Sequence, residues 1–198
     1  MGFAISWMAV QGCDPAQAAE ALGLELDDGD PWDLPDGDCV GELPGGWVLV
    51  WTEDFDALRK GRFAPLLKFG PAVACAVEEH VMVQEARGYR DGAEIWRVTH
   101  DPNEGESLYH LDIAGEPPAN LEAIRSAAFR EQEAGGGEDA GVDLISDVPL
   151  DLAKSICGFK HDLEPPEGAT FRGLRKAGKR TPSRDAKPGF FARLFGSR

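Results

Sequence analysis

The sequence predicts an α+β fold, a mainly antiparallel sheet of about five to six strands packed with three to four helices, plus a disordered C-terminal tail. Several strand-like runs follow one another between residues 72 and 113, and adjacent strands joined by short turns form antiparallel sheets. Helix signals precede and follow these runs. A hydrophobic content of 42% in 198 residues is enough to form the core of one domain.

The N-terminal region predicts a strand, a helix and a long loop. Residues 3–10 are rich in strand formers. Asp14, followed by proline, provides a helix N-cap, and Gly23 stands just after the expected helix of residues 16–22. Residues 25–46 are rich in Asp, Gly and Pro, which is typical of a loop. The aspartates of this loop lack the ligand spacing of an EF-hand, so no calcium site is expected.

A buried strand and an interrupted helix are expected next. Residues 47–51 form a short, continuous apolar run, which is typical of a strand covered on both faces. Asp54 can cap a helix over residues 55–60 that resumes over residues 65–69.

The stretch from Ala72 to Asp101 organises the predicted sheet. Asp91-Gly92 favours a two-residue type I′ turn, with one strand before it and one after it. If these two residues form the tip, Arg87 faces Trp96 across the hairpin. The same register places His100 on the apolar face, as a core histidine with one hydrogen-bond partner.

Glu78 and Glu79 interrupt the strand that leads into this hairpin. In an unbroken strand, Glu79 would point into the apolar face, where an unpaired carboxylate is costly. The chain is therefore expected either to bend at this point or to provide a buried partner for Glu79. The bend is favoured because unbroken strands of this length are uncommon.

The remaining elements are a strand and two helices. Residues 108–113 predict a strand, and residues 120–134 predict the longest helix. An aspartate followed by a proline precedes a last helix over residues 150–157, which Gly158 ends. His161 follows this helix, where it can interact with the helix dipole.

Charge divides the chain into an acidic body and a basic tail. Residues 168–198 carry nine basic residues and one acid, whereas residues 1–167 carry 11 basic and 34 acidic residues, a formal charge of −23. We expect one α+β domain over residues 1–163 and a flexible basic tail over residues 164–198. The body should repel nucleic acid and attract cationic partners.

The end of the tail has an amphipathic pattern over residues 189–196. Its apolar and basic members are Phe190, Phe191, Arg193, Leu194 and Phe195. Such a segment predicts either weak contact with a membrane surface or docking to a partner. A tail that only solubilises the chain is the alternative.

One group of polar residues around the predicted hairpin is a candidate catalytic site. Its members are Glu78, His80, Asp101, His110 and Asp112. Histidine and carboxylate side chains on one sheet face could bind a divalent metal or serve as an acid/base pair for hydrolysis. No HExxH or other spaced motif supports a metal, and a solvated sheet face contains the same residue types.

Other signals are negative. The four cysteines form no CxxC pair, so neither a zinc ribbon nor a disulfide framework is expected. No GxSxG, Walker or dinucleotide motif occurs, so no cofactor is expected. The sequence has no secretory leader and no apolar run of membrane-spanning length, which favours a cytoplasmic protein.

Three phrases, ELPGGWVLV, VEEHVM and DVPLDLAKSICGFKHD, resemble those of small uncharacterised bacterial proteins. The resemblance covers most of residues 1–162 and implies no activity or site residue.

The charge distribution favours a non-enzymatic interaction protein whose acidic domain binds a cationic protein partner. An immunity protein of a polymorphic-toxin system fits this profile. The alternative hypothesis is a small metal-dependent hydrolase that uses the His/Asp sheet face.

Overall fold

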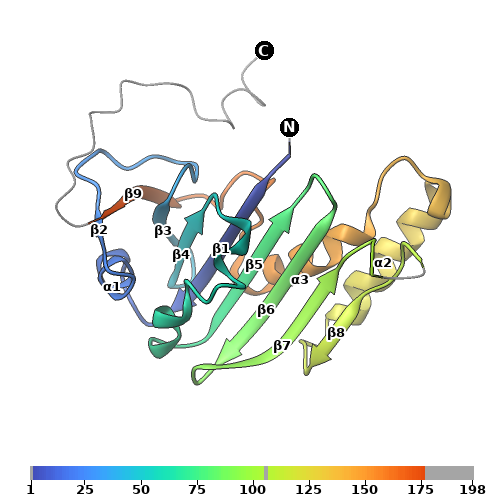
Figure 1. The fold of residues 1–198 in the computed structure, drawn as a ribbon, viewed down its shortest axis with the longest axis horizontal. Helices are drawn as coiled ribbons and strands as arrows, with labels where there is room; N and C mark the ends of the chain where they lie inside the picture. The colour runs from blue at the N-terminus through green and yellow to red at the C-terminus, as the bar shows by residue number, and fades with distance from the viewer. Residues whose placement is uncertain (1, 105–106, 177–198) are drawn as a thin grey trace, which may run out of the picture.

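The computed structural model describes residues 2–104 and 107–176. They form an open, antiparallel sheet and three α-helices, which confirms the α+β class (Figure 1). The sheet has nine strands in the order β2-β9-β3-β4-β1-β5-β6-β7-β8, more than the five or six expected.

The elements have the following bounds. The strands are β1 (Ala4–Gln11), β2 (Leu24–Leu26), β3 (Cys39–Leu43), β4 (Trp47–Thr52), β5 (Ala72–Glu78), β6 (Val83–Arg90), β7 (Ala93–His100), β8 (Asp112–Gly115) and β9 (Thr170–Lys176). The α-helices are α1 (Pro15–Ala21), α2 (Leu121–Ala134) and α3 (Val148–Cys157), and the 3-10 helices are η1 (Phe55–Ala57), η2 (Ala64–Lys68), η3 (Gly137–Asp139) and η4 (Ile145–Asp147).

Strand β1 occupies the centre of the sheet, between β4 and β5. Trp7 belongs to the core on one face, whereas Met8 and Val10 belong to the core on the other. Because successive side chains of a strand point to opposite faces, apolar residues at successive positions suit a strand that is covered on both faces.

Different elements cover the two faces (Figure 1). Helices α2 and α3 pack on one face, where Leu150 and Leu152 of α3 join Trp7 in the core. On the opposite face, Ala18 of α1 and Phe63 of the η1–η2 segment cover the strands around β1. None of the described helices lies over β6, β7 and β8 on that second face.

Local helix signals predicted the helix ends well. The Asp14 side chain accepts a hydrogen bond from the Gln17 backbone N–H, and the Gln17 side chain accepts one from the Asp14 backbone N–H. This capping box starts α1 as expected. Gly158 follows α3 with a φ of 79°, the left-handed conformation that favours glycine. The 3-10 helices η1 and η2 replace the interrupted α-helix expected over residues 55–69.

The predicted domain boundary at residue 163 was too early. Strand β9 lies between β2 and β3, and its Phe171 is fully buried. Strands β2 and β3 also lie within the segment that was expected to be a loop. The basic composition of β9 made it resemble a solvated tail, but Arg172 donates to the Asp27 carbonyl at 3.0 Å and Arg175 pairs with Asp28 at 3.1 Å. Contacts with the acidic body thus hold two arginines of this strand, and the carboxylates of Glu25 and Asp28 compensate the charge of Arg175.

The β6–β7 hairpin has the expected turn but a different register. Next to the turn, Tyr89 pairs with Glu94 in the register that a two-residue turn gives, whereas Gly88 pairs with Trp96, so Ile95 is an extra residue in a β-bulge. A Cβ at Gly88 would lie 2.0 Å from Nε1 of Trp96, so the indole requires a glycine there. The predicted pairing of Arg87 with Trp96 was therefore wrong, and Arg87 lies opposite Arg97.

Strand β8 begins later than the strand predicted over residues 108–113. Residues before Asp112 form a turn, in which the Ser107 side chain accepts a hydrogen bond from the Tyr109 backbone N–H. The carbonyl of His110 accepts a hydrogen bond from Nδ1 of His100. These hydrogen bonds hold residues 107–110 in the turn, so these residues do not pair with β7.

Candidate functional site

A pocket of about 510 Å³ opens at the end of the sheet where β5 turns into β6. It lies between that turn, the start of β6, the η4 region and the segment after α3. Polar residues from all four segments line it, including Glu79, His80, Gln84, Asp143, His161 and Asp162.

The sequence left open whether the chain bends at Glu79 or provides a partner for its carboxylate, and the structure shows both. Strand β5 ends at Glu78 and the chain turns at once, with Met82 at a φ of 56° before β6 begins. The Glu79 carboxylate is partly buried and accepts hydrogen bonds from the Phe3 backbone N–H at 2.8 Å and from Nε2 of His161 at 3.1 Å. Partial burial acts to raise the pKa of Glu79, but these hydrogen bonds outweigh it, so the pKa lies below its ordinary value.

His161 is 2% exposed, far more buried than its place after a helix suggested. The Phe3 ring packs edge-on against it, with ring centroids 5.0 Å apart. Among the described residues, Nδ1 of His161 has no hydrogen-bond partner, and an Asp162 carboxylate oxygen lies 4.0 Å away.

Gln84 is the second buried polar residue of the pocket with an unpaired atom. It lies in β6 opposite His100 of β7 and is 3% exposed. Its side-chain oxygen accepts no hydrogen bond within the described part of the chain.

His100 is a fully buried histidine, as expected, but it has two partners instead of one. Nδ1 lies 3.1 Å from the His110 carbonyl, and Nε2 lies 2.8 Å from Oδ2 of Asp143. Oδ1 of Asp143 accepts hydrogen bonds from the backbone N–H groups of Ile145 and Ser146. Both ring nitrogens of His100 thus lie within hydrogen-bonding distance of an oxygen atom.

Lys160, which is 7% exposed, lies beside the pocket. Its Nζ is 3.0 Å from Asp147, 3.2 Å from Asp151 and 3.7 Å from Asp162. Burial acts to lower the pKa of Lys160, but the three carboxylates outweigh it and raise the pKa. Burial raises the pKa of Asp147 despite the neighbouring ammonium group.

The structure brings together only two of the five predicted catalytic residues. His80 lies in the β5–β6 turn, with Nδ1 2.6 Å from Glu78. Asp101 follows β7, His110 contributes its backbone carbonyl to His100, and Asp112 opens β8. The described residues contain no group of three or more His, Cys, Asp or Glu arranged to hold a metal ion.

The predicted docking residues of the tail lie outside the described residues. They are Phe190, Phe191, Arg193, Leu194 and Phe195. Within the described ranges, no helix is long and apolar enough to cross a membrane.

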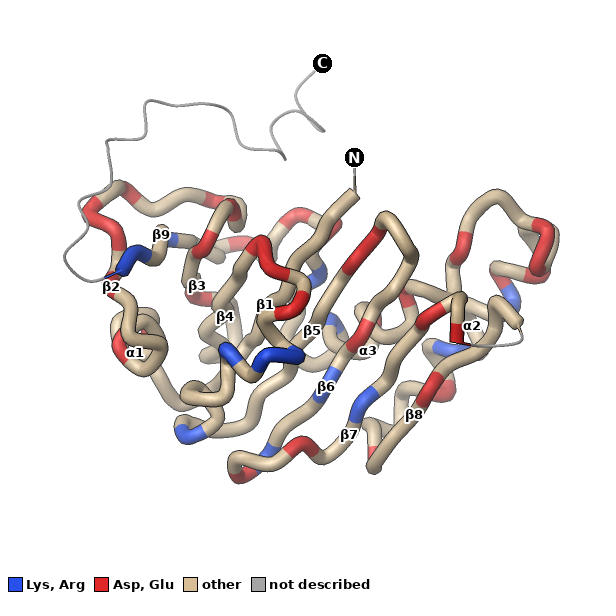
Figure 2. The backbone as a smooth tube through the Cα atoms, viewed as in Figure 1, with Lys and Arg blue, Asp and Glu red and all other residues tan. Residues whose placement is uncertain are grey.

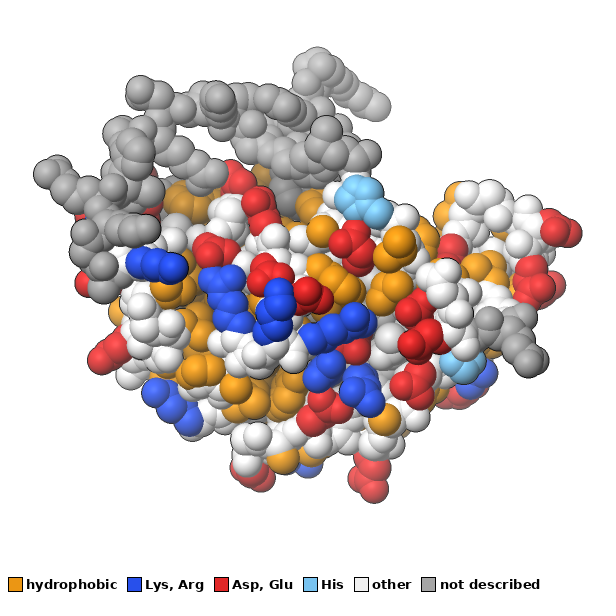
Figure 3. Space-filling model, in the orientation of Figure 1, with side chains coloured by type: hydrophobic (Ala, Val, Ile, Leu, Met, Phe, Trp, Pro, Cys, Tyr) orange, Lys and Arg blue, Asp and Glu red, His pale blue; other side chains and the backbone are white. Residues whose placement is uncertain are grey.

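The sheet face of β6–β8 that no described helix covers carries a balanced charged network. Arg87 donates to Glu85 at 2.8 Å and to Glu94 at 3.2 Å. Figure 3 shows basic side chains in a band across this side of the molecule. Together with Arg97 opposite Arg87, these four side chains have a formal charge of zero, so this network adds no net negative charge.

Carboxylates concentrate at one edge of the sheet, where the pocket also lies. Because neighbouring strands are antiparallel, the start of β3 and the ends of β4, β5 and β7 meet at this edge. The β4–β5 connection continues over residues 57–71, and the parts of the connecting segments next to these strand ends are residues 27–38, 53–56, 79–82 and 101–104. They contain 12 Asp or Glu and no Lys or Arg, and we call them the acidic edge (Figure 2).

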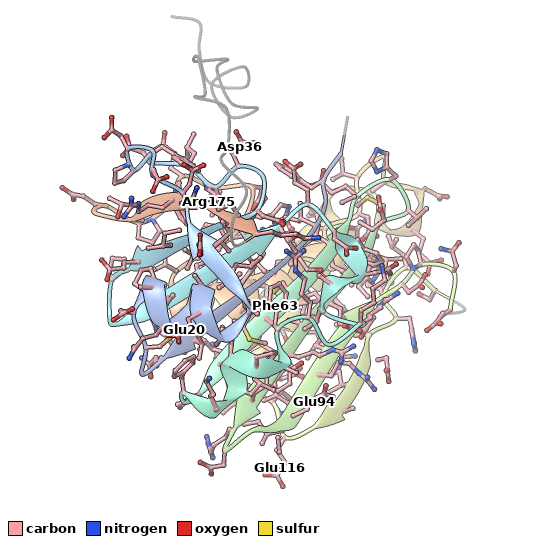
Figure 4. The ribbon with its side chains drawn as sticks, turned by 60° about the vertical axis from the view of Figure 1, so that its left-hand side comes forward. Glu20, Asp36, Phe63, Glu94, Glu116 and Arg175 are labelled. Carbon is pink, nitrogen blue, oxygen red and sulfur yellow. The ribbon has the colours of Figure 1, made fainter. Side chains whose placement is uncertain are left out.

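The opposite edge is poor in charge. Its connecting segments are residues 12–14, 44–46, 69–71 and 91–92. They contain two aspartates and no other charged residue. Figure 4 shows Asp36 of the acidic edge at one end of the molecule and Glu94 and Glu116 at the other.

Sequence reasoning missed most of the pocket. Gln84 and Asp143 carried no local signal, because Gln84 lies in a strand and the partner of Asp143, His100, lies 43 residues earlier. The one usable signal was Glu79, whose position in an apolar strand required a partner.

Comparison of the chain with family models, curated proteins and solved structures gave no match.

Proposed function

We propose that the chain is a non-enzymatic interaction protein that binds a cationic protein partner through the acidic edge. The observation that carries this proposal is the contrast between the two edges of the sheet. Twelve carboxylate residues occupy one set of connections and two occupy the other, with no Lys or Arg in either set. An edge of one charge attracts an oppositely charged partner and orients it during approach.

Internal ion pairs occupy several basic residues of the body and leave its net negative charge unchanged. Of the 11 basic residues before residue 168, five lie within 4.0 Å of a carboxylate of the described chain. They are Lys60, Arg62, Arg87, Arg125 and Lys160. Lys60 pairs with Asp54 and Asp56, Arg62 with Asp38 and Arg175 with Asp28, so four of the twelve carboxylates have a Lys or Arg partner within the described chain and the acidic edge keeps a net negative charge.

An immunity-type inhibitor is one form that this function can take. Such a protein would cover a basic surface of its target with the acidic edge. The hydrolase alternative has less support, because only Glu78 and His80 of its five residues meet.

The test begins with affinity capture from the native host, followed by measurement of association rates with the captured partner. One variant carries Asp30→Asn, Asp33→Asn and Glu53→Gln, three changes at exposed positions of the acidic edge. A matched control carries Glu20→Gln, Asp91→Asn and Glu116→Gln, which remove the same charge elsewhere. We expect the first variant to lower the association rate constant about tenfold and the control to change it less than about twofold.

Salt dependence provides an independent reading of the same experiment. The association rate should fall steeply between low and high NaCl concentration, because salt screens exposed charges. An acidic partner, or a rate that is equal in both variants and insensitive to salt, would contradict the proposal.

A further inference from the structure

We propose that the pocket at the β5–β6 turn binds a guanidinium group, which donates hydrogen bonds to Gln84 and His161. If the guanidinium group belongs to an arginine of the partner, this inference rests on the proposed function above. If it belongs to a free guanidinium compound, the inference is independent of that function.

The first argument is the side-chain oxygen of Gln84. Gln84 is 3% exposed and lines the pocket, and its oxygen accepts no hydrogen bond from the described residues. Buried acceptors in proteins are nearly always paired, since an unpaired one loses its water without compensation. A donor inside the pocket would satisfy this oxygen.

The second argument is the ring of His161. Its Nε2 lies 3.1 Å from the carboxylate of Glu79. An ionised carboxylate can accept hydrogen bonds but cannot donate them, so Nε2 carries the proton. In the neutral ring, Nδ1 is then a hydrogen-bond acceptor. This atom is buried and has no partner among the described residues, so the neutral form of His161 offers a second vacant acceptor in a residue that lines the pocket.

The third argument is charge. Four carboxylate residues line the pocket, namely Glu79, Asp143, Asp147 and Asp162. Lys160 pairs with Asp147 and Asp162, whereas the ion-pair partners of Asp143 and Glu79 are histidines, so one ammonium group faces four carboxylate residues. A cationic donor therefore fits the pocket better than a neutral donor of the same shape.

Guanidinium combines the required properties. It is planar, carries a positive charge under all ordinary conditions and presents five N–H donors when it is attached to an alkyl chain. A pocket of about 510 Å³ lies within the usual size range of small-ligand sites. It can therefore take the group together with part of the chain that bears it.

The test is titration of the full-length chain at constant ionic strength. The probes are methylguanidinium chloride, urea as its neutral isostere, free arginine, and a pentapeptide with a central arginine between alanines. Binding is followed by calorimetry and by the NMR signals of the His161 ring. We expect saturable binding of methylguanidinium, a shift of the His161 signals, and binding of urea that is at least about tenfold weaker.

Three variants locate the binding. Gln84→Leu removes the acceptor at similar volume, and Asp162→Asn removes one charge from an exposed rim residue. Glu20→Gln makes a comparable change on α1, away from the pocket (Figure 4). Gln84→Leu should weaken methylguanidinium binding about tenfold and Asp162→Asn a few-fold, whereas Glu20→Gln should leave it within about twofold. Circular dichroism of each variant verifies that it is folded.

The outcomes separate this inference from the proposed function. Stronger binding of the peptide than of free arginine identifies a partner's side chain as the ligand, and the reverse order identifies a small molecule. Methylguanidinium that fails to saturate, that binds no better than urea, or that binds folded Gln84→Leu as well as the original chain would overturn the guanidinium site. Salt-dependent binding of a basic partner in that case would leave the acidic-edge proposal standing.

Discussion

Glu79 and His161 lie 82 positions apart in the chain and are joined by a hydrogen bond of 3.1 Å between Oε1 and Nε2. The same carboxylate accepts a hydrogen bond from the Phe3 backbone N–H, and the Phe3 ring packs against the imidazole. One side chain thus connects the N-terminal segment, the β5–β6 turn and the segment after α3. The wall of the pocket depends on this three-way contact.

We expect Glu79→Gln to lower the free energy of unfolding by about 1–3 kcal/mol at pH 7, since hydrogen bonds to a charged group contribute about that much. The pKa of Glu79 in the folded protein lies below its ordinary value of 4.5. Its contribution is therefore present above about pH 4.5 and disappears as the pH falls through the folded-state pKa.

Urea denaturation of both chains across pH 3 to 7 measures this effect. The stability difference between the original chain and Glu79→Gln should shrink on acidification. Glu104→Gln, a change at an exposed position near the same edge, is the control and should alter stability by less than about 0.5 kcal/mol. A difference that is constant across the whole pH range would contradict the prediction.

The thiols should differ sharply in reactivity. Cys39, Cys75 and Cys157 are buried, whereas Cys13 is partly exposed. Burial raises the pKa of Cys157 to about 11 and that of Cys75 well above its ordinary value, so neither forms a thiolate at neutral pH. Burial and the neighbouring Asp14 also raise the pKa of Cys13.

A thiol-specific disulfide reagent at pH 8 should therefore modify one cysteine of the folded chain slowly and the other three only after denaturation. Mass spectrometry of the labelled peptides should identify Cys13 as the reactive site. Rapid labelling of Cys157 without denaturant would show that α3 does not bury it as described.

Strand β9 should be essential to the sheet. Phe171 is fully buried between β2 and β3, and its ring and the neighbouring backbone occupy the space that a Cβ at Gly41 would need. We expect Phe171→Ala to lower the free energy of unfolding by about 3–5 kcal/mol because it removes a large core side chain. Denaturant unfolding measures this loss, and Thr170→Ala, at an exposed position of the same strand, should cost less than about 1 kcal/mol.

The parts of the fold that sequence predicted are those with local causes. Asp14 caps α1 through its own first turn, and Gly158 ends α3 through its own backbone conformation. Strand β9 escaped prediction because its partners lie about 130 residues earlier in β3 and about 150 residues earlier in β2, and because its arginines made it resemble a solvated tail. The hairpin register failed for a similar reason, since the size of Trp96 over Gly88 decides it and the turn residues do not.

The candidate site was predictable only in outline. The misplaced charge of Glu79 indicated that a partner must exist, but nothing near it in the sequence identified His161. The hydrolase residues were grouped by alternation along strands that were assumed to be continuous. The turn before Asp112 and the bulge at Ile95 interrupt the strands, so the alternation of side chains between the two sheet faces is not continuous from one predicted residue to the next.

Lys160→Met should destabilise the fold. The change removes the cation that three aspartates share, and it leaves Asp147 partly buried without its counter-charge. The three carboxylates that remain are partly exposed to water, so we expect a loss of about 1–3 kcal/mol, less than a fully buried pair would cost. The pKa of Lys160 is raised in the folded chain, so its contribution is fully present below about pH 10.5 and disappears as the pH rises through the folded-state pKa.

Denaturant unfolding of Lys160→Met and of Lys154→Met at pH 7 distinguishes this role from a general loss of positive charge. Lys154 is exposed on α3 and forms no ion pair within the described residues, so its replacement should change stability by less than about 0.5 kcal/mol. Adding Asp147→Asn to Lys160→Met should recover part of the loss, because it removes a carboxylate that burial already penalises. Equal stability of Lys160→Met and Lys154→Met would contradict this prediction. It would show that water stabilises the three carboxylates as well as the ammonium group does.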